Sequence, residues 1–399
     1  MPDLDWPAAA RELAAQFAER AARHDREGSF PFENFEDLRA AGFFALTVPE
    51  DRGGFGASRK SFLAVQEELA RGDGSTALAF MMHTKFFGAQ RESLTYPERW
   101  YNELCRGAVQ DGWLCNTVAT EEGLGSPAGG GLPDTVAVQV DGGWEINGRK
   151  TFTTMAPLLR YFIVLGRIDN PGGSPDIAQF VLYRDDPGVR IEETWDALGM
   201  RSTGSHDFVM EACRVPADRL ATRRPVNQAD PRGAPGMAWF ALGVAATTVG
   251  VAQAARDFAV AFARERTPNS QQTIKDYPGV RNRIGRIDLL LQRSRALIRD
   301  ADDAWQMSHG SQRRASEGQM SAMNRVAAAK IDTLNNCIEA VDLAMRVVGG
   351  VSLLKKNPIE RYYRDVRAGL HNPPIEDRAL EMLARAALDE PPPPLKANE

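Results

Sequence analysis

Residues 346–376 read RVVGGVSLLKKNPIERYYRDVRAGLHNPPIE, and this stretch decides which fold is expected. Its glycine pair, Gly349-Gly350, follows a long segment of helical apolar periodicity. Glycines let a backbone approach a ligand closely because they carry no side chain. The basic and aromatic run ERYYRD comes next, and a second helix is expected near Pro374. From spacing alone, a helix C-terminus followed by a surface loop is the simpler explanation.

Composition and charge limit the classes of function. The chain has 399 residues, which predicts two or three domains, and it is 43% apolar and 25% charged, as in ordinary globular proteins. A net charge of −5 argues against nucleic acid as the main partner. No apolar run approaches the ~20 residues of a membrane span, and the N-terminus does not resemble a secretory signal. We therefore expect a cytoplasmic protein, without a membrane partner, whose four scattered cysteines are buried free thiols and hold no metal.

Hydrophobic periodicity predicts an α+β multidomain protein. Residues 1–112 have helical character, and residues 113–222 show the alternation and turn signals of a small antiparallel β-barrel or sandwich. A linker is expected at 222–235, a four-helix bundle at 235–388 and a disordered tail at 389–399. The strands are expected at 113–120, 135–140, 144–154, 161–167, 177–183, 189–193 and 207–215.

Two segments of the β region carry residues suited to binding a ring or a phosphate. ATEEGLGS, at 119–126, places a glycine-rich turn after the first strand, where backbone N–H groups and hydroxyls meet one edge. INGRKTFTTMA, at 146–156, puts Phe152 and Thr154 on the same face of a strand because they lie two residues apart. An ordinary loop and a buried hairpin are the alternatives.

These segments resemble motifs of the acyl-CoA dehydrogenase family of flavoproteins, which includes flavin-dependent monooxygenases of the same fold. ATEEGLGS is similar to TEPxxGSD, INGRKTFTTMA to NGxKxWITNG, and RVVGG to QxxGG, while RERTPNS keeps only the arginine of R-x-F-G. The resemblance implies an FAD cofactor, or FMN in a monooxygenase, and a homotetramer or at least a dimer. It implies that the flavin contacts Thr120, Ser126, Phe152 and Thr154, and that a neighbouring protomer supplies Arg266, Arg346, Gly349 and Gly350.

The resemblance fails at the catalytic base. Family members use a glutamate, either eight residues after the position of Asp365, which is Pro373 here, or on the first bundle helix, where Phe240 matches. Glu376 or Asp377 could take this role if the loop is shifted, although both also suit the N-terminus of a helix.

Two reactions of the same fold are therefore considered. The first is FAD-dependent α,β-oxidation of an acyl-CoA, with hydride transfer to flavin N5 and an electron-transfer flavoprotein as partner. The alternative is a two-component monooxygenase that uses O2 and reduced flavin from a flavin reductase, in which His371 together with His83 would move protons. His371 could equally be a residue bonded to backbone at the start of a helix. A helical binding protein that has lost its cofactor is a third possibility.

Overall fold

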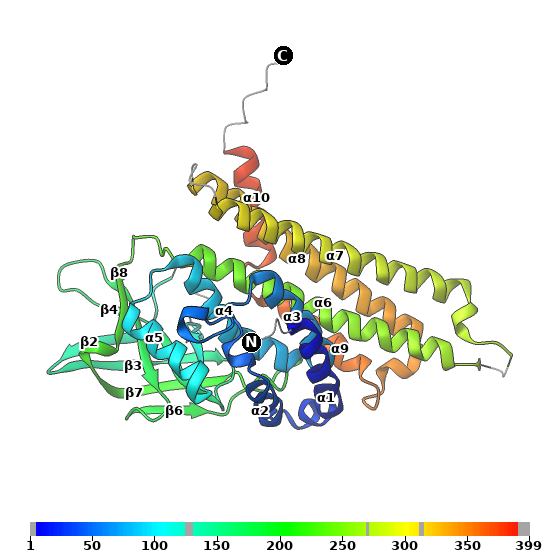
Figure 1. Cartoon of the computed structure of the whole chain (residues 1–399), viewed down its shortest axis with the longest axis horizontal. Helices are drawn as coiled ribbons and strands as arrows, with labels where there is room; N and C mark the ends of the chain where they lie inside the picture. The colour runs from blue at the N-terminus through cyan, green and yellow to red at the C-terminus, as the bar shows by residue number, and fades with distance from the viewer. Residues whose placement is uncertain (1–4, 124–130, 269–270, 311–314, 390–399) are drawn as a thin grey trace, which may run out of the picture.

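The computed structural model describes residues 5–123, 131–268, 271–310 and 315–389. Short helices occupy the centre of the molecule, a sheet lies at one side, and long helices extend to the other side (Figure 1). The order of helical region, β region and helical bundle confirms the expected fold class. The tail 390–399, predicted to be disordered, lies outside the described residues.

The described residues of the N-terminal region, which begin at residue 5, contain five α-helices. They are α1 (Trp6–Glu27), α2 (Phe32–Ala40), α3 (Arg59–Gly72), α4 (Gly74–Ser93) and α5 (Glu98–Arg106). Helix α1 begins where the Asp5 side chain accepts a hydrogen bond from the Ala8 N–H, and it ends at Gly28, which takes the left-handed conformation at φ 65°. Helix α4 is buried along almost its whole length, as its apolar sequence predicts, and it packs between α6 and β1. Its side chains therefore reach the space between the sheet and the bundle.

In the described part of the chain, eight strands form one sheet. They are β1 (Leu114–Val118), β2 (Val136–Val140), β3 (Gly143–Thr153), β4 (Leu159–Ile168), β5 (Asp176–Tyr183), β6 (Val189–Glu192), β7 (His206–Pro216) and β8 (Leu220–Pro225). Their order is β6-β7-β3-β2-β4-β5-β8, and β1 pairs with β4. Neighbouring strands are antiparallel, with two exceptions. Strand β1 runs parallel to β4, and β2 also pairs with β4 in parallel, at one residue pair.

Strand β8 corrects the predicted boundary at residue 222. Residues 222–225, predicted to begin a linker, continue the strand and pair with β5. The sequence TRRP lacks apolar alternation because β8 lies at the end of the sheet, and Arg223 there pairs with Asp176 in a partly exposed contact. Only the pairing with β5, which is a tertiary contact, makes this segment a strand.

The C-terminal region is built on three long helices and two short ones. They are α6 (Gly233–Glu265), α7 (Pro278–Gly310), α8 (Ala315–Val348), α9 (Ile359–Asp365) and α10 (Glu376–Leu388). Helices α6 and α8 both end on the side of the bundle that faces away from the sheet (Figure 1). Helix α6 is long and apolar enough to cross a membrane, which was not expected from the sequence. However, 83% of its most apolar 18-residue stretch is buried inside the protein.

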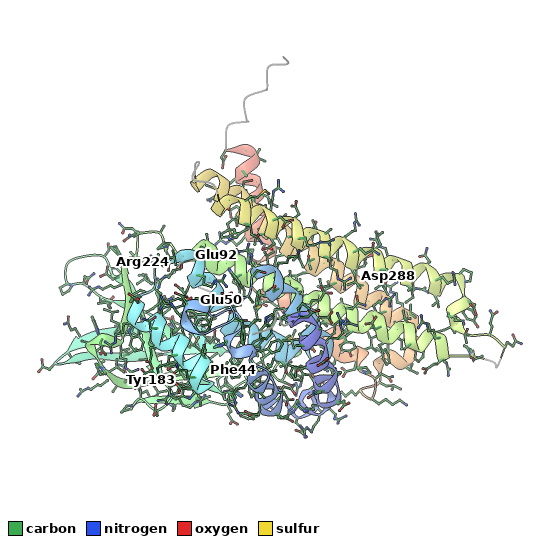
Figure 2. All side chains as sticks on the ribbon, viewed as in Figure 1. Phe44, Glu50, Glu92, Tyr183, Arg224 and Asp288 are labelled. Atoms are coloured by element: carbon green, nitrogen blue, oxygen red, sulfur yellow. The ribbon has the colours of Figure 1, made fainter. Side chains whose placement is uncertain are left out.

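A buried polar cluster fastens α4 to the bundle. The Arg59 side chain, 2% exposed, pairs with Glu92 at 2.7 Å and with Asp302 at 2.5 Å. Glu92, labelled in Figure 2, also accepts hydrogen bonds from the indole N–H groups of Trp239 and Trp305. Because these residues come from α3, α4, α6 and α7, the cluster fixes the helix that forms one wall of the candidate site.

Candidate functional site

A cavity of about 560 Å³ lies where α4, the ends of β1 and β3, the segment before β7, and the chain around 364–373 meet. Four of the residues predicted from sequence line it: Thr120, Phe152, Thr154 and His371. The structure thus brings together residues from three separate parts of the chain. We take this cavity as the candidate active site.

A buried ion pair positions the Thr120 side of the cavity. Glu121 and Lys150 are 3% and 0% exposed, and Lys150 Nζ lies 2.6 Å from Glu121 Oε1. The other Glu121 contacts are the backbone N–H groups of Asp134 and Thr135 and the Thr135 hydroxyl. Burial favours the protonated acid, but hydrogen bonds from Lys150 and Thr135 outweigh it and hold the pKa of Glu121 below its usual value. This pair joins the segment after β1 to strand β3.

Phe152 presents an aromatic ring at the mouth of the cavity. Its side chain is 62% exposed, and its ring meets Trp195 edge to face at a centroid distance of 5.5 Å. Its φ is 53°, a conformation that bulky residues seldom adopt and that occurs more often at functional sites. An exposed ring held in this way offers a flat apolar face to a planar ligand.

Hydroxyl groups line the wall behind Phe152. Thr154 Oγ1 lies 3.0 Å from Ser205 Oγ, which lies 2.8 Å from Thr203 Oγ1. The Asn116 side chain donates to the Thr154 carbonyl at 3.1 Å, so β1 fixes the backbone of this wall. These contacts place polar hydrogen atoms close to the aromatic face, which suits a heteroaromatic ring bearing nitrogen and oxygen acceptors. The lining therefore fits the isoalloxazine of a flavin.

The cavity wall at 198–200 is held by α9. The Met200 N–H donates to Asp365 Oδ1 at 2.6 Å, and the Arg364 guanidinium donates to the Leu198 carbonyl at 3.0 Å. Arg364 is itself paired with Asp25 and Glu360. Burial raises the pKa of Asp365 to about 7, although the Met200 N–H and Arg361 oppose this shift.

Lys330 holds the loop that carries His371. Its side chain, 1% exposed, donates to the carbonyls of Gly369, Asn372 and Pro374 at 2.9, 2.7 and 2.9 Å. Burial lowers the pKa of Lys330 to about 8. His371 is exposed and lines the cavity, so a rigid loop presents its imidazole to that space.

Both positions expected for a catalytic base line the cavity as Pro373 and Phe240. Among the described residues, none that lines this cavity is an aspartate or a glutamate. Glu376 begins α10, is exposed, and accepts a hydrogen bond from the Asn335 side chain. The structure thus does not bring the suggested carboxylate into the lining, and neighbouring Asp377 is also absent from it.

His83 is not part of the cavity lining, contrary to the suggestion that it works with His371. It is 0% exposed, its Nε2 lies 2.9 Å from the Phe44 carbonyl, and its Nδ1 accepts from the Cys115 N–H. Because Nδ1 accepts, Nε2 is the protonated nitrogen of a neutral ring, and burial lowers the pKa of His83 to about 4. It is a structural residue. The four cysteines are buried free thiols, as predicted.

The remaining predicted residues do not line the cavity. Arg266 follows α6, Arg346 lies in the last turn of α8, and Gly349 and Gly350 come directly after it. All four are exposed, and the two helix ends lie on the side of the bundle away from the sheet (Figure 1). Ser126 lies outside the described residues.

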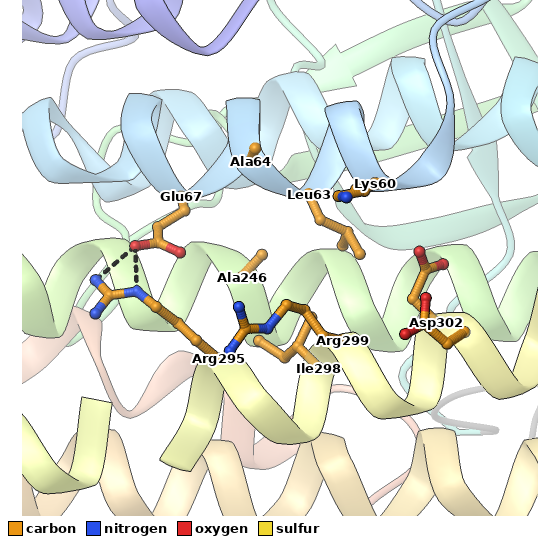
Figure 3. Close-up of a pocket in the computed structure, with 10 residues that line it drawn as sticks. Lys60, Leu63, Ala64, Glu67, Ala246, Arg295, Ile298, Arg299 and Asp302 are labelled. Atoms are coloured by element: carbon orange, nitrogen blue, oxygen red, sulfur yellow. Dashed lines mark hydrogen bonds and ion pairs between the residues drawn. The ribbon is translucent and has the colours of Figure 1, made fainter. Parts of the chain in front are cut away.

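A separate hollow of about 250 Å³ lies between α3, α6 and α7 (Figure 3). Glu67 and Arg295 face each other across it at 2.6 Å, and Asp302 is paired with Arg59. Glu67, Arg295 and Asp302 are thus each engaged in an ion pair, the last of them with a residue outside the hollow. This hollow contains none of the predicted site residues.

Three family models match consecutive parts of the chain. Residues 6–107 match the acyl-CoA dehydrogenase N-terminal domain, residues 116–213 the middle domain and residues 242–372 the C-terminal domain. The chain belongs to the acyl-CoA dehydrogenase family. It is therefore a flavin-dependent enzyme of the oxidoreductase class, as the resemblance implied.

Individual relatives include more than one reaction type. The chain is 41% identical to YdbM of Bacillus subtilis (strain 168), whose name places it among the acyl-CoA dehydrogenases, over 389 residues, 96% of this chain and 97% of that one. It is 32% identical to L-evernosamine nitrososynthase of Micromonospora sp. over 361 residues, 88% of this chain and 81% of the relative. The structure of a KijD3 in complex with FMN and dTDP-3-amino-2,3,6-trideoxy-4-keto-3-methyl-D-glucose superposes with a TM-score of 0.86, at 29% identity, over 97% of this chain and 95% of that one.

Several lining residues are not among those predicted from sequence. They include Asn116, Trp195 and Ser205, which only the fold brings to the cavity. Lys85 did carry a signal, because it is the one charged residue in the otherwise apolar or neutral stretch 75–87. A lysine on a buried helix face points to a polar cavity or a partner.

Proposed function

We propose that this enzyme is a flavin-dependent monooxygenase rather than an acyl-CoA dehydrogenase. The observation that carries the proposal is a lining that contains no carboxylate among the described residues, with Pro373 and Phe240 at both positions where the family places its base. Removal of an α-proton from a thioester needs a base in contact with the carbon acid, and neither side chain can accept a proton. Some relatives support the same choice, among them a nitrososynthase and a structure with FMN bound, whereas the relative at 41% identity carries the name of an acyl-CoA dehydrogenase.

The residues of the cavity have distinct roles in this proposal. A reduced flavin, FMN or FAD, supplies the electrons by which one oxygen atom of O2 enters the substrate and the other leaves as water. Phe152 and Trp195 would hold the flavin ring, and the hydroxyls of Thr120, Thr154 and Ser205, which line the same cavity, would hydrogen-bond to it. Leu78, Met82 and Phe240 exclude water from the substrate side.

His371 is the proposed proton donor and acceptor of the reaction. Among the described residues it is the histidine that lines the cavity, and an imidazole can both donate and accept a proton. It is also close in sequence to Pro373, the position that lacks a base. Lys330 keeps it in place through the backbone of the loop.

The reductant is proposed to arrive from outside, as reduced flavin from a separate flavin reductase. An electron-transfer flavoprotein would be needed only for thioester oxidation. The exposed Arg266, Arg346, Gly349 and Gly350 are proposed to bind the cofactor of a neighbouring protomer in a homo-oligomer, a dimer or tetramer. Analytical ultracentrifugation of the wild type and of Arg346→Ala, each with flavin titration, tests this. A monomer that binds flavin normally would contradict it.

Two measurements on the purified enzyme separate the two reactions. In the first, a flavin reductase with NADH supplies reduced FMN or FAD, and isotope-labelled O2 is followed into products by mass spectrometry. In the second, acyl-CoA thioesters of several chain lengths are mixed anaerobically with the flavin-loaded enzyme. We expect label in an oxygenated product and no loss of oxidised-flavin absorbance with any thioester. Bleaching by a thioester would overturn the proposal, and its loss in Glu376→Gln would identify the base.

A further inference from the structure

Lys85 is the partly buried residue of an otherwise buried stretch of α4 and lies at the junction of two cavities. It lines the active-site cavity and an adjoining one of about 340 Å³. The two cavities share Thr117, Thr120, Phe240 and Pro373 as well. A molecule that extends from one cavity into the other would therefore pass the Lys85 ammonium.

Lys85 differs from the other cations of these cavities because no carboxylate pairs with it among the described residues. Arg364 pairs with Asp25 and Glu360, Arg367 with Asp342, and Arg232 with Asp230. The Lys85 ammonium lies over the ring of Phe240, 5.5 Å from its centroid. Burial lowers the pKa of Lys85 to about 8. A largely desolvated cation without a counter-ion is unfavourable in the free enzyme and gains most from binding an anion.

The surroundings of Lys85 narrow the kind of anion. Met82 and Leu78, one and two helical turns before it on α4, line the same cavity, and the ring of Phe240 faces it from α6. Such walls suit an apolar body, whereas the lining has no carboxylate that could pair with a substrate ammonium. An amine substrate in its protonated form would instead be repelled by Lys85.

We propose that Lys85 binds the anionic group of the substrate, and that the substrate is an apolar molecule bearing one oxyanion such as a carboxylate or sulfonate. This assignment rests on the proposed function only in calling the bound molecule the oxygenated substrate. The anion preference itself is a property of the cavity and is measured without oxygen.

Calorimetric binding to the flavin-loaded enzyme tests the proposal with probes that share one apolar body. Benzoate and benzenesulfonate carry an oxyanion, benzamide is neutral, and benzylamine is a cation. We expect the better of the two anions to bind at least about tenfold more tightly than benzamide or benzylamine, a difference of about 1.4 kcal/mol. Comparing the two anions shows whether a carboxylate or a sulfonate is preferred.

Lys85→Met should abolish the preference, while Lys85→Arg should retain most of it. Lys60→Met is the matched control, because Lys60 is an exposed lysine on α3 that lines only the separate hollow of Figure 3. Flavin affinity should be the same in all variants. Thermal melts establish that each one is folded, and Lys85→Gln replaces Lys85→Met if that variant does not fold.

Several results would overturn the assignment. They are equal binding of benzamide and benzoate, no binding of either anion, or an anion preference that persists without the Lys85 charge. Weakened flavin binding in Lys85→Met would show that the ammonium serves a cofactor phosphate instead. An intact anion preference together with bleaching by acyl-CoA would refute the monooxygenase proposal while leaving the anion site in place.

Discussion

Lys150 and Glu121 form an ion pair that is almost completely removed from solvent, with 2.6 Å between Nζ and Oε1. Each residue is next to a cavity-forming segment in the sequence, since Glu121 follows Thr120 and Lys150 lies two residues before Phe152. The Thr151 N–H also donates to the Thr120 carbonyl at 2.9 Å. The pair therefore sets the distance between the two sides of the proposed flavin site.

Loss of one partner of this pair should be costly. We expect Lys150→Met to lower the free energy of unfolding by about 3–5 kcal/mol, because the Glu121 carboxylate stays buried without its cation. The double variant Glu121→Gln/Lys150→Met should cost less. Arg214→Met is the control, since the Arg214–Glu145 pair is largely exposed and should contribute about 1 kcal/mol or less. Urea unfolding measures all three, and equal losses for Lys150→Met and Arg214→Met would contradict the expectation.

His371→Asn should slow substrate oxygenation by about 10²–10⁴-fold, the usual contribution of a positioned acid or base. Flavin affinity should not change, and the pH dependence of turnover should differ from that of the wild type because no imidazole remains to transfer the proton. The measurement is steady-state oxygenation with reduced flavin over a range of pH. Glu376→Gln serves as control and should keep wild-type rates, because Glu376 lies outside the cavity lining. A slow Glu376→Gln variant together with a fully active His371→Asn variant would instead assign the catalytic role to Glu376.

Lys330→Met should loosen the loop 369–374, because three backbone carbonyls lose a common charged donor. Hydrogen bonds from a charged group contribute about 1.5–3 kcal/mol each to a buried site, although the cost of burying the ammonium offsets part of this. We expect faster amide hydrogen exchange in that loop and a lower turnover with unchanged flavin affinity. Unaltered exchange would show that Lys330 does not hold the loop.

Asp365 should make stability fall as pH rises from about 4 to about 7. Its folded-state pKa of about 7 lies above the ordinary value of 3.8, so the folded protein binds the proton more tightly than the unfolded chain does. The stabilisation is complete below the unfolded pKa and is lost as pH passes 7, with a slope of at most about 1.4 kcal/mol per pH unit.

The groups that shift the pKa of Asp365 lie on α9 and in three other parts of the chain. Arg361 favours its charged form, whereas Asp73 and Asp25 oppose it. Asp365→Asn keeps an acceptor for the Met200 N–H and removes the titration. The difference in unfolding free energy between wild type and variant should fall towards neutral pH and then level off. A difference independent of pH would show that Asp365 is ionised throughout.

Local sequence patterns identified most of the sheet and the aromatic–hydroxyl side of the site. Alternating residues predicted seven strands, and Phe152 and Thr154 both line the cavity as expected. They do not do so as neighbours on one strand face, because β3 ends at Thr153 and Phe152 has a φ of 53°. The pattern missed β8 because its residues form a strand only through pairing with β5. It also could not show that β1 runs parallel to β4, since that pairing joins segments about 45 residues apart.

The sequence by itself determined the family, the order of helical and β regions, and the absence of a glutamate at Pro373 and Phe240, because these depend on residue identity and local periodicity. Only the tertiary structure decided which polar groups share the cavity. It separated His83 from His371 and Glu376 from the lining, and it left the Lys85 ammonium without a carboxylate among the described residues. Burial and ion pairing depend on which distant segments come into contact, and that is a property of the folded chain.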